Sequence, residues 1–382
     1  MSVQPIVALD VGSSKVACLI AMPGEQHQHY EILGSSLIAY QGSGDDGVGE
    51  GWPSDVLLLG RTIEQALEAT GVSGDFIQAH VTFSHPSLRS ETVQGALMLA
   101  DEPVTIRKHH LELLARSALT QALGIDREAL LIERLGCSGN GFEGVRDPHG
   151  LVATRLLGTF HVISMPIVVQ RTIMQGVESV GLEVASMTYS LIAAAAALSE
   201  AHTARRILLI DIGGVSTDIG VFAGGVLLAS HTIAWGGITL ASSVAKELRL
   251  TLEQAMALSL EGLGSARIDV RQCVETPLQE IGRALHKLLK EGPRPDLALV
   301  TGRGALIDGI AEWLERTTQI KTSLGRSARL HAMADLSRQV GLSASVGLAT
   351  LVTASTPIAN LPSSRVVDRL LARTKSLLTE YF

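Results

Sequence analysis

The stretch that decides the fold of this chain is residues 206–222, which read RILLIDIGGVSTDIGVF. Residues 206–210 and 219–222 are short apolar runs, and a glycine-rich polar turn joins them. Apolar runs of this length on either side of a turn are typical of buried strands rather than of helices. In such a turn the glycines let backbone N–H groups face an anion, and the hydroxyls of Ser216 and Thr217 add further donors. We therefore expect a buried hairpin whose turn binds phosphate.

The same pattern occurs near the beginning of the chain. Residues 5–21, PIVALDVGSSKVACLIA, again give an apolar run, a polar glycine turn and a second apolar run. Ser13, Ser14 and Lys15 are suited to hold a phosphate in this turn. Asp10 and Asp211 end the first strand of the two hairpins, where a carboxylate can hold Mg²⁺ through water. Because the unit recurs, the sequence predicts two halves of related design.

A third glycine turn follows a third apolar run. Residues 297–300 are apolar, Gly302, Arg303 and Gly304 follow, and we expect a helix over 306–316. A turn at a helix N-terminus can bring the backbone close to a base or ribose. Each turn taken alone is an ordinary connection. The chain contains neither GxxxxGK followed by Ser or Thr nor GxGxxG, so a P-loop and a Rossmann site have no support.

Composition excludes several classes of protein. The 382 residues carry a net charge of −7, opposite in sign to that of a non-specific nucleic-acid binder, so we expect no nucleic-acid partner. The three cysteines are widely spaced, which argues against a disulfide framework. Mean hydropathy is +0.29. The longest uncharged stretch, 219–245, is broken by paired glycines and is not expected to span a membrane.

With its three turns in this order, the chain resembles the actin-like ATPase superfamily, and within it the bacterial FtsA cell-division family. The resemblance covers essentially the whole chain through VALDVGSSKVACLI, EGVRDPHGLVATRLLGTFHVI, VESVGLEVASMTYSLIAAAAAL, IDIGGVSTDIGVF, IAWGGITLASSVAKEL and LVTGRGALIDGIAEWL. It implies ATP and Mg²⁺ as cofactors, with Mg²⁺ held through water by Asp10 and Asp211. The nucleotide-binding positions that it implies are Asp10, Gly12, Ser13, Ser14, Lys15, Asp211, Gly213, Gly214, Ser216, Thr217, Gly236, Gly237, Gly302, Arg303 and Gly304.

The resemblance also implies an α/β fold of two actin-like lobes, each a mixed sheet flanked by helices, with a nucleotide cleft between them. Lobe I would comprise 1–84 with 164–180, and lobe II 181–237 with 297–356. An FtsA-type small domain at 85–163 and a small subdomain at 238–296 are inserted into these lobes. A linker at 357–364 and a helix at 365–382 complete the chain.

Three positions depart from the family pattern. Val215 stands where a third glycine is usual, and we expect its β-branched side chain to crowd the loop and to resist a positive φ. Arg303 replaces a glycine of the third turn. Ser190 stands where the family carries a carboxylate or amide beside the attacking water, and a serine cannot act alone as a general base. We therefore expect weak or absent hydrolysis and no identifiable catalytic residue.

The last residues have the pattern of a basic amphipathic helix, because Arg365, Arg369 and Arg373 lie off a single apolar stripe. Such a helix can lie in a membrane interface, although a terminal helix docked on the protein's own surface is the alternative. The resemblance implies a membrane anchor on the cytoplasmic face of the inner membrane at the division site. The membrane-contacting residues would be Val366, Leu370, Leu371, Leu377, Leu378 and Phe382.

The FtsA resemblance further implies a protein that polymerises and tethers FtsZ filaments to the membrane. Its expected partners are the FtsZ C-terminal peptide, further copies of itself, the lipid surface and other division proteins. Lys246, Arg249 and Lys287 are candidate contacts for the acidic peptide. Two alternatives remain: a PilM-like pilus-assembly protein that binds a membrane-protein peptide, and a small-molecule kinase of the same superfamily.

Overall fold

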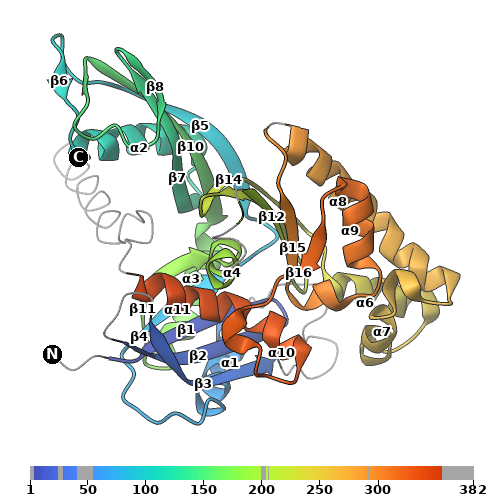
Figure 1. Ribbon diagram of the computed structural model, residues 1–382. Helices are drawn as coiled ribbons and strands as arrows, with labels where there is room; N and C mark the ends of the chain where they lie inside the picture. Colours follow the sequence, from blue (N-terminus) through green and yellow to red (C-terminus); the bar gives the residue numbers. More distant parts are fainter. Residues whose placement is uncertain are drawn as a thin grey trace, which may run out of the picture.

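The computed structural model describes residues 4–24, 29–40, 55–198, 204, 206–290 and 292–354. Within these residues the chain forms two five-stranded sheets, a four-stranded sheet and a two-stranded ribbon (Figure 1). The linker at 357–364 and the helix at 365–382 that the sequence predicts lie outside the described residues.

The first five-stranded sheet has the order β11-β4-β1-β2-β3. Its central hairpin is antiparallel and joins β1 to β2 through residues 12–14, whereas β4 and β11 run parallel to β1. Every residue of β1 is buried, which explains the continuous apolar run before Asp10. The strands are β1 (Ile6–Val11), β2 (Lys15–Pro23), β3 (Tyr30–Ala39), β4 (Gln78–Phe83) and β11 (Glu183–Tyr189).

The second five-stranded sheet repeats this arrangement in the order β14-β13-β12-β15-β16. Here β12 and β13 form the antiparallel hairpin, and β15 and β16 run parallel to β12. The strands are β12 (Arg206–Ile212), β13 (Thr217–Ala223), β14 (Val226–Ile233), β15 (Leu297–Thr301) and β16 (Thr322–Leu324). Two mixed sheets with the same strand order confirm the predicted pair of related halves.

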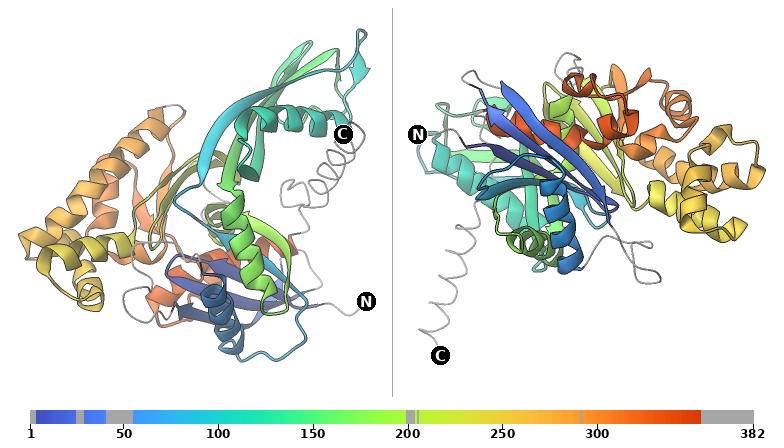
Figure 2. Two further views of the ribbon diagram at one scale, coloured as in Figure 1. Left: turned by 180° about the vertical axis from the view of Figure 1, so that it is seen from behind. Right: turned by 90° about the horizontal axis from the view of Figure 1, so that it is seen from below.

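A separate four-stranded sheet, called the small sheet below, has the order β5-β10-β7-β8 and carries α2 on one face. It projects away from the two larger sheets in Figure 1 and in the left view of Figure 2. Its elements are β5 (Arg89–Met98), α2 (Lys108–Ala122), β7 (Arg127–Gly139), β8 (Phe142–Val145) and β10 (Arg155–Pro166). The short ribbon of β6 (Val104–Thr105) and β9 (Val152–Ala153) lies at the far end of this domain (Figure 1).

Two helices join the lobes at their centre. In α4 (Ser190–Ala197) and α11 (Ser343–Thr353) most residues are small, and a Cβ on Gly347 would overlap the carbonyl of Ala193. The two helices therefore pack backbone to backbone. The apolar side chains of α11 also pack against one face of β1 and β2. The other face of the first sheet is covered by α1 (Val56–Glu68) and α3 (Ile167–Glu178).

The lobe boundaries differ from the expected ones at two places. The sequence places residues 181 onward in lobe II, but β11 pairs in parallel with β4 of the first sheet. The sequence also assigns residues up to 356 to lobe II, whereas α11 packs on β1 and β2. Strand pairing and helix packing of this kind depend on tertiary contacts that a local pattern does not contain.

Helices cover the second sheet and its small subdomain. Buried apolar residues of α6, α8 and α9 pack together with the strands β12 and β15 in one core. The helices are α6 (Gly237–Leu248), α7 (Leu252–Ser259), η2 (Gly262–Gly264), α8 (Ile268–Lys290), η3 (Arg303–Leu306) and α9 (Ile310–Thr318). Two short helices follow before α11, η4 (Ala328–Leu330) and α10 (Leu336–Gly341), and Leu330 of η4 packs against the first sheet. The helix expected from residue 306 begins only at Ile310, because residues 303–306 form the short 3-10 helix η3.

The small sheet contacts lobe II through a buried polar pair. The His161 imidazole on β10 shares a 2.9 Å hydrogen bond between Nε2 and the Ser230 hydroxyl on β14. His161 is 2% exposed, its Nδ1 has no partner in the described structure, and burial lowers the pKa of His161 to about 4. The imidazole is therefore neutral at pH 7, and Ser230 is its partner across the interface.

Replacing Ser230 by alanine is expected to lower the free energy of unfolding by about 1–3 kcal/mol, because both ring nitrogens of His161 then lack a partner. In the parent protein and in Ser230→Ala, the free energy of unfolding should fall as the pH drops from about 6.5 to 4, because His161 takes up a proton in the unfolded state but not in the folded state. Urea unfolding at pH 7.5 and pH 5 measures both effects. Ser243→Ala, at an exposed serine of α6, is the control, and equal losses in the two variants would contradict the interpretation.

Candidate functional site

The three glycine turns predicted from the sequence come together around one cavity of about 320 Å³ between the lobes. This volume is within the range of small-molecule sites in proteins. The first turn (residues 12–14), the second turn (213–216) and the third turn (302–304) each contribute to its lining, and further walls come from α4, α6, α7, α10 and α11. Predicted site residues that line the cavity are Asp10, Gly12, Ser13, Ser14, Lys15, Asp211, Gly213, Gly214, Ser216, Gly237, Gly302, Arg303 and Gly304.

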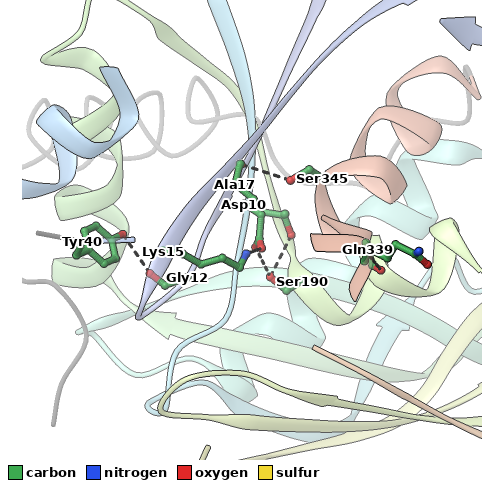
Figure 3. A network of polar contacts seen from close by, with 10 residues as sticks. Asp10, Gly12, Lys15, Ala17, Tyr40, Ser190, Gln339 and Ser345 are labelled. Carbon is green, nitrogen blue, oxygen red and sulfur yellow. Dashed lines mark hydrogen bonds and ion pairs between the residues drawn. The ribbon is translucent and has the colours of Figure 1, made fainter. Parts of the chain in front are cut away.

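The first turn is closed by a bond from the Gly12 N–H to the Lys15 carbonyl, 2.9 Å long. The Tyr40 hydroxyl donates to the Gly12 carbonyl at 3.1 Å and holds the turn from outside. Inside, Lys15 Nζ forms a 2.6 Å ion pair with Asp10 Oδ2, and the Ser190 hydroxyl donates to Asp10 Oδ1 at 3.3 Å (Figure 3). Asp10 is thus held by both a cation and a hydroxyl at the base of the cavity.

The second turn is closed in the same way, by a 2.9 Å bond from the Gly213 N–H to the Ser216 carbonyl. The first two residues of α6 hold it, since the Gly237 and Ile238 amides donate to the carbonyls of Gly213 and Gly214. A Cβ on Gly214 would lie 2.6 Å from the Ser13 hydroxyl oxygen, so the two turns approach each other too closely for a larger residue there.

The expected conflict at Val215 does not occur. Only Arg249 and Gln319 have a positive φ among the non-glycine residues that the structure describes, so Val215 lies in an ordinary conformation. Its side chain is buried, and its N–H donates to the Ser13 hydroxyl oxygen at 3.2 Å. Val215 therefore links the two turns.

Carboxylates concentrate at the inner end of the cavity. Burial, and then the negative charges of Asp218 and Asp10, raise the pKa of Asp211 to about 7. Burial also raises the pKa of Asp218, whose carboxylate accepts bonds from the Tyr189 and Thr232 hydroxyls at 2.8 and 2.6 Å. A site with this surplus of carboxylates attracts a cation.

The third turn contributes glycines that have no room for a side chain. Gly302 has φ 78° and ψ 163°, a conformation that is essentially restricted to glycine. A Cβ there would overlap the Asp211 carboxylate, and a Cβ on Gly304 would overlap the Ile212 side chain. The third turn is therefore fixed directly against the end of β12.

Two predicted site residues lie away from the cavity. The Thr217 side chain is fully buried and donates to the Trp235 carbonyl at 2.8 Å, so it supports the turn from behind. Gly236 lies under the second turn, where a Cβ would be 2.5 Å from the Gly213 carbonyl oxygen. Neither residue lines the cavity.

Sequence reasoning missed several lining residues. Asp218 and Ser84 face the inner end, and Met256, Leu260 and Ser337 line the outer walls. Asp218 follows the second turn directly, so its position could have been noticed. The residues of α7 and α10 carry no local signal, because only the folding of distant segments brings them to the cavity.

The donor set fits a nucleotide with Mg²⁺. Among the described residues, no three His, Cys, Asp or Glu side chains lie close enough to hold a metal ion by themselves. Mg²⁺ commonly takes only one or two carboxylates and completes its shell with water and phosphate oxygens. Asp10 and Asp211 match this requirement, and the buried Thr301 hydroxyl, which lines the cavity, has no partner within the described structure.

The predicted partner-binding cations are exposed but do not form one patch. Lys246 and Arg249 lie at the end of α6, where Glu247 approaches Cys273 of α8. Lys287 lies near His231 of β14, toward the other end of α8. About four helical turns separate Cys273 from Lys287 along α8. In the part of the chain that the structure describes, no helix is long and apolar enough to cross a bilayer.

Comparisons with known proteins agree with this geometry. The family model described as "Cell division protein FtsA" matches residues 208–347. The cell division protein FtsA of Escherichia coli K12 is 22% identical over 385 aligned residues, covering 90% of this chain and 89% of the relative. The FtsA of Neisseria meningitidis serogroup B is 25% identical and covers 99% of this chain and 98% of the relative.

Solved structures share the fold at low identity. The PilM-PilN type IV pilus biogenesis complex superposes with a TM-score of 0.70 at 15% identity, over 92% of this chain and 98% of that one. MreB 5 of Spiroplasma citri bound to AMPPNP has a TM-score of 0.50 at 14% identity, over 91% and 95%. The fold is therefore the two-lobed actin-like α/β fold, and one structure that shares it contains a nucleotide.

Proposed function

We propose a function from the premise that this chain is a distant member of the FtsA cell-division family, within the actin-like ATPase superfamily. The chain binds ATP with Mg²⁺ in the cavity between its lobes and assembles into filaments on the cytoplasmic face of the membrane. These filaments tether FtsZ polymers at the division site. The observation that supports nucleotide binding is the meeting of three glycine turns from two lobes around one acidic cavity.

The residues of the first two turns would bind the phosphates. Backbone amides of the turns, with the hydroxyls of Ser13, Ser14 and Ser216, provide donors for phosphate oxygens. Asp10 and Asp211 would hold Mg²⁺ through water, and the ion would neutralise phosphate charge. Lys15, paired with Asp10, keeps that carboxylate in place. The third turn would lie against the ribose and base.

Hydrolysis is proposed to be slow or absent. Ser190 begins α4 beside Asp10, and its hydroxyl donates to the Asp10 carboxylate. A serine hydroxyl is not itself a base, and the carboxylate to which Ser190 donates is ion-paired with Lys15, so Ser190 is poorly suited to take a proton from water. Binding and release of nucleotide, rather than rapid turnover, would then control assembly.

Nucleotide binding is tested by titration of the full chain with ATP, once with Mg²⁺ in excess over the nucleotide and once with EDTA. We expect saturable binding that weakens at least about tenfold when Mg²⁺ is removed, because bound phosphates lose their counter-charge. Isothermal titration calorimetry gives the dissociation constants. Absence of ATP binding under both conditions would refute the proposed function.

The membrane step rests on residues 365–382, which lie outside the described part of the chain. Val366, Leu370, Leu371, Leu377, Leu378 and Phe382 would enter the interface, and the arginines between them would contact anionic headgroups. One such helix binds weakly, so filament formation would strengthen attachment through multivalency. Lys246 and Arg249 remain proposed contacts for the FtsZ peptide, with Lys287 as a separate contact.

The membrane proposal is tested by co-sedimentation of the chain with anionic vesicles, compared with a variant that ends at Leu361. We expect the truncated variant to remain in the supernatant while it binds ATP as tightly as the full chain. Equal sedimentation of the two proteins would refute the proposed membrane anchor and favour the alternative of a PilM-like protein that binds a membrane-protein peptide.

A further inference from the structure

Arg303 is the one position of the third turn at which the structure admits a side chain. Its neighbours Gly302 and Gly304 both lie against the end of β12, where a Cβ would overlap Asp211 or Ile212. Arg303 begins η3 and is partly exposed. The turn thus keeps the two glycines that contact β12 and directs a long cationic side chain from between them.

The Arg303 side chain runs along the outer wall of the cavity. Its Cγ and Cδ lie 3.8 Å from the position that a Cβ on Gly341 would take, so the aliphatic part crosses the end of α10. Met256 of α7 and Leu260, the residue after this helix, line the same cavity and are 42% and 52% exposed. The outer end of the cavity is therefore bounded by apolar surface and one guanidinium.

The guanidinium of Arg303 forms no ion pair with any residue that the structure describes. The carboxylates in the cavity belong to the first two turns and to Asp218, and Lys15 is paired with Asp10. Of the two cations that line the cavity, Lys15 is thus neutralised by Asp10, whereas no carboxylate of the described residues pairs with Arg303.

We propose that Arg303 holds the base of the bound nucleotide by stacking its guanidinium plane on the face of the purine. This inference rests on the proposed function. A planar guanidinium stacks on aromatic rings, and Met256 and Leu260 supply an apolar wall for the same base. Stacking is tolerant of base identity because every base has a π face. Arg303 therefore strengthens binding of ATP and GTP alike, and the chain discriminates little between them.

The test compares dissociation constants of three ligands, all with Mg²⁺: ATP, GTP and inorganic tripolyphosphate. In the full chain, Arg303→Gly restores the glycine that the family pattern has, and Arg303→Lys keeps the positive charge but lacks the planar guanidinium group. Arg338→Ala, at an exposed arginine of α10 that does not line the cavity, is the matched control.

We expect Arg303→Gly to weaken ATP and GTP binding by about tenfold each. Arg303→Lys should recover only part of the loss, and Arg338→Ala should match the parent protein. Tripolyphosphate, which has no base, should bind all four proteins equally. Unchanged nucleotide binding in Arg303→Gly, or an equal loss for tripolyphosphate, would overturn the base-stacking role while leaving nucleotide binding in place.

A parent protein that binds neither ATP nor GTP would instead overturn the proposed function, and the role of Arg303 with it. A parent protein that binds ATP more than about a hundredfold better than GTP would show that hydrogen bonds to the edge of the base determine the affinity, which contradicts a base-tolerant stacking contact.

Discussion

Replacing Gly302 by alanine is expected to lower the free energy of unfolding by about 2–6 kcal/mol and to abolish nucleotide binding. Two costs combine in this variant. The backbone conformation at φ 78° and ψ 163° costs an alanine about 1–3 kcal/mol. The added methyl group would also overlap the Asp211 carboxylate and the Ile212 carbonyl, and overpacking of this kind costs about 1–3 kcal/mol.

The cost of the backbone conformation and the cost of steric overlap can be separated by a variant at a second glycine with a positive φ. Gly71 has φ 71°, and no atom lies within 4 Å of the position that its Cβ would take. Gly71→Ala should therefore lose only about 1–2 kcal/mol and should keep full ATP affinity. Chemical denaturation and ATP titration of both variants give the comparison. If the two variants lost the same stability, contact between the third turn and β12 would not be what fixes Gly302.

Replacing Asp211 by asparagine is expected to have opposite effects on stability and on function. The folded pKa of about 7 lies above the ordinary value of 3.8, so the folded state holds a proton that the unfolded state releases as pH rises between these values. Stability therefore falls with rising pH across this window, by a few kcal/mol, and is lowest above pH 7. Asparagine removes this dependence and should make the protein more stable at pH 8.

The same substitution should weaken Mg²⁺-dependent ATP binding by about 10- to 100-fold, since it removes one of two proposed carboxylates for the ion. In the parent protein, affinity for ATP with Mg²⁺ should rise from pH 6 to pH 8 as Asp211 loses its proton. Urea unfolding and calorimetry at these pH values measure both effects. Asp75→Asn, at an exposed aspartate, is the control, and a variant Asp211→Asn that is less stable than the parent at pH 8 would contradict the prediction.

Much of the fold could be predicted from local pattern. A fully buried strand between two layers needs a continuous apolar run, and the runs before Asp10 and Asp211 had that character. The glycine turns after them could be recognised because only a short, tight connection fits between antiparallel strands. The two hairpins then appeared at the centres of two sheets with the same strand order.

Other features depended on contacts between distant segments. Nothing local shows that β11 pairs with β4, or that α11 packs on β1 and β2. Thr217 was expected to bind phosphate because of its hydroxyl, but it is the first residue of β13 and pairs with Ile212, which turns its side chain behind the turn. The walls from α7 and α10 are brought to the cavity only when the lobes assemble.

The position of the small sheet has a mechanical consequence. Its strands β5, β7 and β10 contact β14 of lobe II, while β7 also contacts β11 of the first sheet, so the base of the sheet touches both lobes. β10 has 12 residues and is therefore about 40 Å long. From His161 to the far end at Arg155, β10 is about 20 Å long. A rotation of about 5° between the lobes, pivoting at the His161–Ser230 contact, would therefore displace that end by about 2 Å. Because the base of the small sheet touches both lobes, a change in the angle between the lobes would move its far end.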